Sequence, residues 1–164
     1  MTLPPYMVVI EMQEPGGPEV LQSATRPLPV LHDHEILVKV AAAGVNRPDL
    51  VQRRGHYPPP KGASDLLGLE VSGEVVAVGA KQTLWAIGDK LCGLTNGGGY
   101  AEYVAIDAPH CLPIPAGISL TDAAGLPDTY FTAWSNVFFN HILPANGHFL
   151  VPGGAGGLGH PAIP

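Results

Sequence analysis

Turn-forming residues recur every ten or so residues through the first 115 positions, and short apolar runs lie between them. This spacing predicts a β-rich domain. Several of the runs alternate only loosely between apolar and polar residues, which is typical of a compact barrel or sandwich. The predicted strands are Met7–Met12, Glu35–Ala42, Val71–Val78, Lys90–Leu94 and Tyr100–Ile106.

A short helix is predicted at Pro48–Arg54, with Asn46 just before it. Proline suits a first helical turn because the amide that it lacks would have no partner inside the helix. The proline-rich stretch 58–62 cannot be regular and is predicted to be a loop. The glycines at 97–99 allow a tight turn between two strands.

After Pro115 the pattern changes from the spacing of strands to that of helices, with Ser119 or Thr121 as the cap. Pro127 divides this region into a short helix and a longer one that reaches about Phe139.

The apolar run His148–Val151 is a predicted buried strand, and a glycine-rich stretch follows it at once. A strand followed by such a turn is how a dinucleotide-binding unit begins. We therefore predict one domain over residues 1–118. Residues 119–164 would form linking helices and the incomplete start of a nucleotide-binding domain.

Charge and composition exclude several partners. The net charge is −6 and only eight residues are Lys or Arg, so no basic cluster could neutralise a nucleic-acid backbone. No apolar run approaches the roughly 20 residues that span a bilayer, and the N-terminus lacks the pattern of a signal peptide. A cytoplasmic protein with no membrane partner is expected. Cys92 and Cys111 are the only cysteines, too few for a disulfide framework.

Five segments in this order resemble the quinone oxidoreductase, zeta-crystallin-like branch of the medium-chain dehydrogenase/reductase superfamily. They are AAAGVNRPDLVQRRGHYPPP, LGLEVSGEVVAVG, IGDKLCGLTNGGGYAEY, LPDTYFTAW and VPGGAGGLG. The resemblance covers the N-terminal half of that family. It implies a mainly β fold with short helices: a GroES-like β-barrel domain, followed by the first strand and glycine loop of an incomplete Rossmann domain.

The resemblance also implies chemistry without zinc. Zinc-dependent members place a catalytic Cys where this chain has Asn46 and a His where it has Leu69. Asn is a poor zinc ligand and Leu is none, so no metal is expected. Without a Lewis acid, alcohol oxidation is disfavoured. A quinone can accept a hydride from a nicotinamide when the protein mainly holds the two rings together.

Four residues are site candidates through the resemblance. Asn46 is the position expected to face the nicotinamide, as a catalytic and cofactor-binding residue; it could equally be a helix cap. Asp49, a candidate for substrate binding, could be only a charge in the first helical turn. Tyr57 is a candidate for catalysis and for stacking on a quinone, or it packs on prolines. The Thr132 hydroxyl would meet the nicotinamide carboxamide, or bond back along its helix. Glu70 is expected to have a structural hydrogen-bonding role.

The cofactor's pyrophosphate is expected on the glycine loop, because glycines let the backbone approach an anion. The candidate contacts are Gly153, Gly154, Gly156, Gly157 and Gly159. Pro161 and Pro164 depart from the family pattern. Pro164 would fall deeper in the following helix and remove one of its hydrogen bonds.

We predict a zinc-independent NAD(P)H:quinone oxidoreductase with NADPH as cofactor and NADH possible. A small quinone is the expected partner, and a homo-oligomer is possible. A non-catalytic GroES-like module and an enone reductase remain alternatives. The 164-residue chain alone is expected not to reduce quinones at a meaningful rate, because the adenosine contacts of a Rossmann domain come from later strands.

Overall fold

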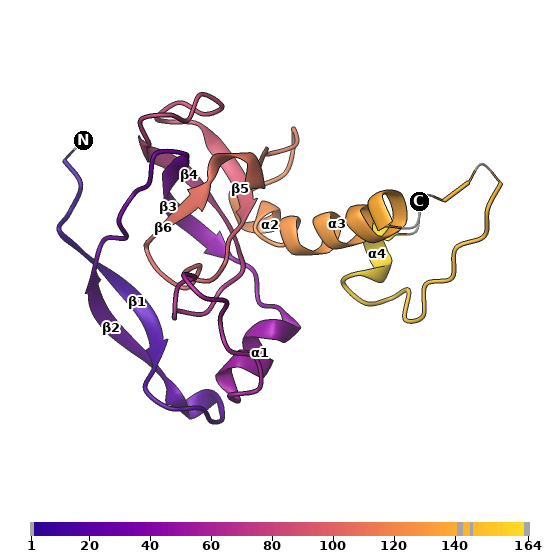
Figure 1. The fold of residues 1–164 in the computed structure, drawn as a ribbon, viewed down its shortest axis with the longest axis horizontal. Helices are drawn as coiled ribbons and strands as arrows, with labels where there is room; N and C mark the ends of the chain where they lie inside the picture. Colours follow the sequence, from indigo (N-terminus) through magenta and orange to yellow (C-terminus); the bar gives the residue numbers. More distant parts are fainter. Residues whose placement is uncertain (1, 141–142, 145, 163–164) are drawn as a thin grey trace.

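The computed structural model describes residues 2–140, 143–144, 146 to 162. Its largest element is a five-stranded antiparallel sheet in the order β6-β3-β4-β5-β7 (Figure 1). These strands are β3 (Glu35–Ala43), β4 (Glu70–Val78), β5 (Lys90–Leu94), β6 (Tyr103–Asp107) and β7 (Cys111–Pro113). A separate antiparallel pair is formed by β1 (Tyr6–Met12) and β2 (Leu21–Pro27). The mainly β fold with short helices predicted from the sequence is confirmed.

The two sheets do not close into a barrel, so the expectation of a closed or nearly closed barrel was wrong. The β1–β2 pair meets the chain just before β6 through one isolated bridge between Val9 and Ala101. At the other end of the large sheet, β7 has only three residues and ends at Pro113, which has no amide hydrogen to donate. The two sheets are therefore joined at one point only, and among the described residues no strand pairs with the outer edge of β7.

The core lies on the large sheet. The apolar side chains that alternate along its strands are almost fully buried, as a half-buried sheet requires. They are Ile36, Val38, Val71, Val75, Leu91, Val104, Ile106, Ala108 and Cys111. A smaller cluster of Met7, Val9 and Leu66 packs under the β1–β2 pair.

Short helices connect and extend the sheets. The helices are α1 (Arg47–Arg53), α2 (Leu120–Ala123), α3 (Pro127–Trp134) and α4 (Gly159–Ala162), with 3₁₀ turns at Pro18–Val20 and Ala108–His110. One π-helical turn, Ser135–Asn140, prolongs α3. The predicted division at Pro127 is confirmed. No helix in the described part of the chain is long and apolar enough to cross a lipid bilayer.

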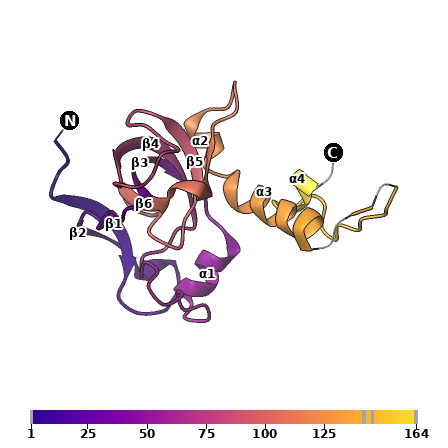
Figure 2. The ribbon, with the colours of Figure 1, turned by 45° about the horizontal axis from the view of Figure 1, so that its top comes forward.

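The region after α2 projects from the β-rich body, and α4 lies beside α3 (Figures 1 and 2). Residues 148–151 are not a strand, which contradicts the predicted first Rossmann strand. Phe149 and Leu150 remain 48% and 86% exposed. A strand needs a hydrogen-bonded neighbour, and the described residues place none beside this segment. The glycine-rich stretch that follows does form a series of turns.

Candidate active site

A cavity of about 750 Å³ brings together most of the residues predicted from the sequence. Its walls come from the start of α1, the loop after it, one side of α3 and the glycine-rich turns. The lining residues are Val45, Asn46, Arg47, Pro48, Val51, Tyr57, Asp128, Thr129, Thr132, Gly153, Gly156, Gly157, Leu158 and Gly159. Of the predicted residues, only Asp49 and Gly154 do not line it.

Asn46 is both a helix cap and a wall of the cavity. It has extended backbone angles just before α1, and its backbone N–H donates to the Asp49 carboxylate at 2.9 Å. Its side-chain Nδ2 donates to Glu70 Oε1 at 2.8 Å. The two readings from the sequence therefore hold together. The bond to Glu70 also fixes which way the Asn46 amide faces.

Asp49 is buried behind the cavity, with 2% of its surface exposed. Its carboxylate accepts hydrogen bonds from the Asn46 N–H, from the Gly68 N–H at 3.0 Å and from the Tyr100 hydroxyl at 3.1 Å. Burial, with the adjacent Asp49 charge, raises the pKa of Tyr100, so this hydroxyl stays a donor. The structure thus gives Asp49 a structural role in anchoring α1, and Asp49 does not line the cavity.

Glu70 connects the sheet to both helices that border the cavity. It is 2% exposed, and Oε2 accepts the Asp128 N–H at 2.9 Å while Oε1 holds Asn46. A Cβ built on Gly44 would lie within 2.6 Å of Glu70 Cγ, so only glycine leaves room for this side chain. Burial raises the pKa of Glu70, the two hydrogen bonds oppose that rise, and the Asp128 and Asp49 charges add to it. The expected structural role of Glu70 is confirmed.

Thr132 and Tyr57 line the cavity from two different segments, Thr132 from α3 and Tyr57 from the loop after α1. The Thr129 hydroxyl bonds back to the carbonyls of Gly125 and Leu126. The Thr132 hydroxyl makes no such bond within the described residues, which leaves it available to a ligand. Tyr57 lines the cavity and is 46% exposed, so solvent or a ligand can reach its side chain.

The glycine-rich turns offer unshielded backbone to the cavity. Gly153 has a φ of +82° with no atom near its missing Cβ, a Cβ at Gly157 would make only an ordinary contact with Thr129, and one at Gly156 would lie a tight 3.2 Å from the Gly153 carbonyl oxygen. The N–H groups of Gly154, Gly157 and Leu158 find no acceptor in the described part of the chain. Free amides and absent side chains suit a phosphate group. Because α4 has only four residues, its dipole adds little.

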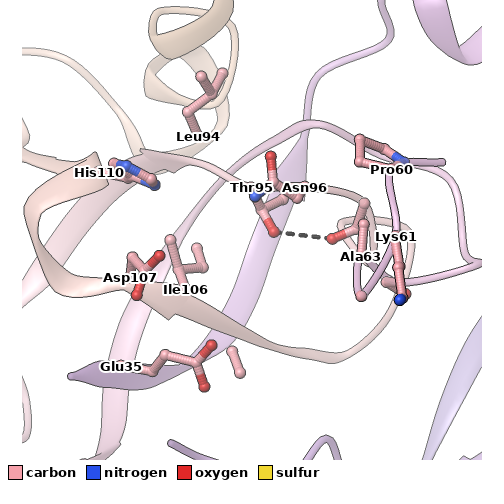
Figure 3. Close-up of a pocket in the computed structure, with 14 residues that line it drawn as sticks. Glu35, Pro60, Lys61, Ala63, Leu94, Thr95, Asn96, Ile106, Asp107 and His110 are labelled. Carbon is pink, nitrogen blue, oxygen red and sulfur yellow. Dashed lines mark hydrogen bonds between the residues drawn. The ribbon is translucent and has the colours of Figure 1, made fainter. Parts of the chain in front are cut away.

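A second cavity of about 290 Å³ is polar and contains none of the predicted site residues (Figure 3). Its labelled walls include Glu35, Lys61, Asn96, Asp107 and His110, and the Thr95 hydroxyl donates to the Gly97 carbonyl at 2.8 Å. It has the wrong lining for a planar apolar ligand, and the larger cavity remains the candidate.

Comparison with known proteins assigns the fold to a family. The model of the alcohol dehydrogenase GroES-like domain matches residues 32–116, just over half of the chain. The chain belongs to this family. The GroES-like domain and the resemblance to quinone oxidoreductases predicted from the sequence are thereby confirmed.

The relatives of this GroES-like chain carry several names. It is 35% identical over 156 residues to a quinone oxidoreductase of Lama guanicoe, covering 93% of this chain and 47% of that protein. It is 37% identical over 145 residues to a synaptic vesicle membrane protein VAT-1 homolog of Danio rerio, covering 88% and 30%. The structure of CurK enoyl reductase aligns with a TM-score of 0.79 at 25% identity, over 96% of this chain and 50% of that one. The chain thus spans about half the length of the quinone oxidoreductase that it matches.

Asn46 and Leu69 are the residues that the resemblance sets at the catalytic zinc-ligand positions of the zinc-dependent members. Among the described residues, no group of three or more His, Cys, Asp or Glu side chains is arranged to hold a metal. Both cysteines are buried free thiols.

Sequence reasoning missed two charged residues that line the cavity, Arg47 and Asp128. Both could have been predicted from their positions in the sequence. Arg47 directly follows Asn46, and Asp128 precedes Thr132 by four residues, which is the spacing that puts two side chains on one face of a helix.

Proposed function

We propose that this GroES-like chain forms the substrate side of a zinc-independent, NAD(P)H-dependent quinone reductase. The observation that carries the proposal is the convergence of Asn46, Tyr57, Thr132 and the glycine-rich turns on one cavity. These residues come from segments up to about 100 positions apart. Their convergence is what a site for two stacked rings and a phosphate requires.

Each wall of the cavity has a separate task in this proposal. The exposed ring of Tyr57 and the apolar Val45, Val51 and Leu158 would hold a planar quinone. The free Thr132 hydroxyl would orient the nicotinamide carboxamide, and the amides near Gly157 would meet the nearest phosphate. The reduced nicotinamide supplies the hydride when it is bound. The protein contributes position and exclusion of water.

The proposed division of the chain follows from this arrangement. Residues 1–118 would supply Asn46 and Tyr57 as a substrate domain, and residues 119–164 would supply Thr132 and the glycine contacts as the start of the cofactor domain. The cavity takes walls from both parts. NADPH is our preferred cofactor and NADH the alternative.

Reduction of an activated alkene is the second candidate. The observation that favours it is the match to a structure named as an enoyl reductase, together with 35% identity over 141 residues to polyketide synthase GfsB of Streptomyces halstedii. An enone also accepts a hydride at carbon while its oxygen takes up negative charge. The same cavity could serve both reactions, so substrate competition has to separate them.

The test uses reduced nicotinamide mononucleotide, which carries the nicotinamide and the phosphate but no adenosine. Because the adenosine contacts are missing, we expect the wild-type chain to be slow, but at millimolar donor it should still accelerate reduction of tetramethyl-benzoquinone measurably over the reaction without protein, and more so than reduction of a matched enone. Tyr57→Ala and Thr132→Val should each lower the rate about tenfold, since each removes about 1.4 kcal/mol of contact. Lys61→Ala, in the polar cavity, is the matched control and should leave the rate unchanged.

Equal rates in wild type and all variants would overturn the proposed function. Faster reduction of the enone would favour the second candidate instead. No binding of quinone or donor would favour a non-catalytic GroES-like module. With NADPH as donor, turnover near about one per second would contradict the expectation from the sequence that adenosine contacts are required.

A further inference from the structure

We infer that Asp128 is the acid of this cavity and donates the proton that a quinone needs after it has accepted the hydride. The inference rests on the proposed function and adds a catalytic residue to it. Asp128 is the only carboxyl group among the residues that line the cavity. It lies four residues before Thr132 on α3, so it is on the side of the helix that faces the proposed nicotinamide position.

The Asp128 carboxyl has no hydrogen-bond or ion-pair partner within the described residues. Its backbone N–H donates to Glu70, but no donor to its side-chain oxygens is found. In contrast, the carboxylates of Asp49 and Glu70 both accept several hydrogen bonds from the protein. Asp128 is therefore the carboxyl that is free to engage a ligand.

The surroundings of Asp128 raise the pKa of its carboxyl. Its side chain is partly buried, and burial is the larger cause that raises its pKa, followed by the negative charge of Asp49. Glu70 from β4 and Asp49 from α1 both lie close to it, and Arg47 and Tyr57 share the cavity walls. The positive end of α3 and the Arg47 charge act in the opposite direction. Arg47 is exposed, where solvent weakens its effect.

The proposed step balances as follows. The C–H bond at C4 of the reduced nicotinamide would break, and its hydride would add to one quinone oxygen, which becomes a hydroxyl while the electron pair moves through the ring and leaves negative charge on the opposite oxygen. The Asp128 carboxyl then transfers its proton to that oxygen, which gives the neutral hydroquinone and an Asp128 carboxylate. Water restores the proton to Asp128, whose partial exposure lets solvent reach it. The quinone is reduced by two electrons, and the nicotinamide donor is oxidised by two.

The first measurement is the titration of the Asp128 carboxyl, followed by NMR in the 164-residue chain labelled with carbon-13 at aspartate. We expect Asp128 to titrate above the ordinary value of about 3.9, and its resonance to be assigned by its loss in Asp128→Asn. The matched control is Asp107, an exposed aspartate at the end of β6, in the variant Asp107→Asn. A titration of Asp128 at or below the ordinary value overturns the inference.

The second measurement is the affinity for tetramethyl-benzoquinone without any hydride donor. A protonated Asp128 can donate to a quinone oxygen, so the affinity should fall about fivefold as the pH rises through its pKa, the equivalent of one hydrogen bond. In Asp128→Asn the amide donates at every pH, and the affinity should not change with pH. Asp107→Asn should behave like the wild type.

The outcomes separate the inference from the function on which it rests. A wild-type affinity that does not depend on pH, with the quinone bound in the cavity, overturns the role of Asp128 alone. Failure of the wild type to bind any quinone between about pH 4.5 and 8 overturns the proposed function, and the donation step with it. Both variants must keep the dispersed amide spectrum of the wild type, which shows that they are folded.

Discussion

Replacing Glu70 should separate the two helices that border the cavity. The Glu70 carboxylate accepts the Asn46 side-chain N–H and the Asp128 backbone N–H, and therefore ties α1 and α3 to β4. In Glu70→Ala both donors lose their acceptor in a place that water reaches poorly. An unsatisfied buried donor costs about 1–3 kcal/mol.

Two effects reduce that loss. Glu70→Ala removes a buried charge, whose raised pKa shows that the fold holds it at some cost, and it removes repulsion from the Asp128 and Asp49 carboxylates. We expect a net loss of about 2–4 kcal/mol in the free energy of unfolding at neutral pH. For a chain of 164 residues this lowers Tm by about 10 °C.

Glu70→Gln separates the loss of hydrogen bonds from the loss of charge. Its carbonyl oxygen can still accept the Asp128 N–H, and its amide can donate to Asn46 Oδ1 if the Asn46 side chain turns over. We expect a loss below about 1 kcal/mol, with a changed side-chain amide resonance for Asn46. The control is Glu74→Ala, an exposed residue on the same strand, which should change stability by less than about 0.5 kcal/mol.

Urea unfolding, followed by the fluorescence of Trp85 and Trp134, measures these differences. If Glu70→Ala lowers the free energy of unfolding by less than about 1 kcal/mol, or if Glu70→Gln lowers it as much as Glu70→Ala, the hydrogen bonds of Glu70 do not hold the two helices to β4.

Three further predictions follow. The folded-state pKa values of Glu70 and Asp128 are raised, so the two carboxyls contribute most to the free energy of unfolding below their unfolded-state pKa values, and that contribution declines as pH rises through the folded-state ones. In a pH series of urea unfolding, the stability of Glu70→Gln relative to the wild type should therefore rise as pH increases from about 4.5, and a constant difference in stability would contradict this. Gly68→Ala should lower the free energy of unfolding by more than about 2 kcal/mol, because φ is +98° and the new Cβ would lie 2.6 Å from Tyr100 N. Gly62→Ala, with a φ of +87° and open space around it, should lose about 1 kcal/mol, and equal losses in urea unfolding would show that the clash with Tyr100 adds nothing. Burial raises the pKa of Cys111 to about 12, so its thiol should react with a disulfide reagent at least about a hundredfold more slowly in the native than in the unfolded chain. Similar reaction rates in the two states would show that the Cys111 thiol is accessible at the surface.

The parts of the fold that the sequence predicted are those that local chemistry decides. Asn46 and Pro48 determine where α1 begins, and Pro127 separates α2 from α3 whatever lies around them. Strands β3, β4 and β5 contain enough apolar residues to be recognised alone.

The missed and wrong elements depend on distant partners. Strand β2 has mostly polar residues and exists because β1 pairs with it over seven positions. The apolar run 148–151 has the composition of a strand, but no neighbour in the described residues pairs with it. A strand needs both a suitable composition and a neighbouring strand to pair with, and only the composition can be read from the local sequence.

The site shows the same division. Asn46, Tyr57 and Thr132 were predicted through motifs, and the structure places them on one cavity. The structural role of Asp49 depends on Gly68 and Tyr100, which lie 19 and 51 residues away in the sequence. No local pattern reveals such contacts, so the sequence offered substrate binding or a first-turn charge for Asp49 and not this structural role.

The most direct test of the central claim is a nitrogen-15 NMR titration of the 164-residue chain with reduced nicotinamide mononucleotide and tetramethyl-benzoquinone, each added alone. We expect amide shifts at Asn46, Tyr57 and Thr132 with either ligand, further shifts at Gly156 and Gly157 with the phosphate-bearing ligand, and none at Lys61 or His110 in the polar cavity. Shifts at Lys61 and His110 without change at Asn46, Tyr57 and Thr132 would contradict it.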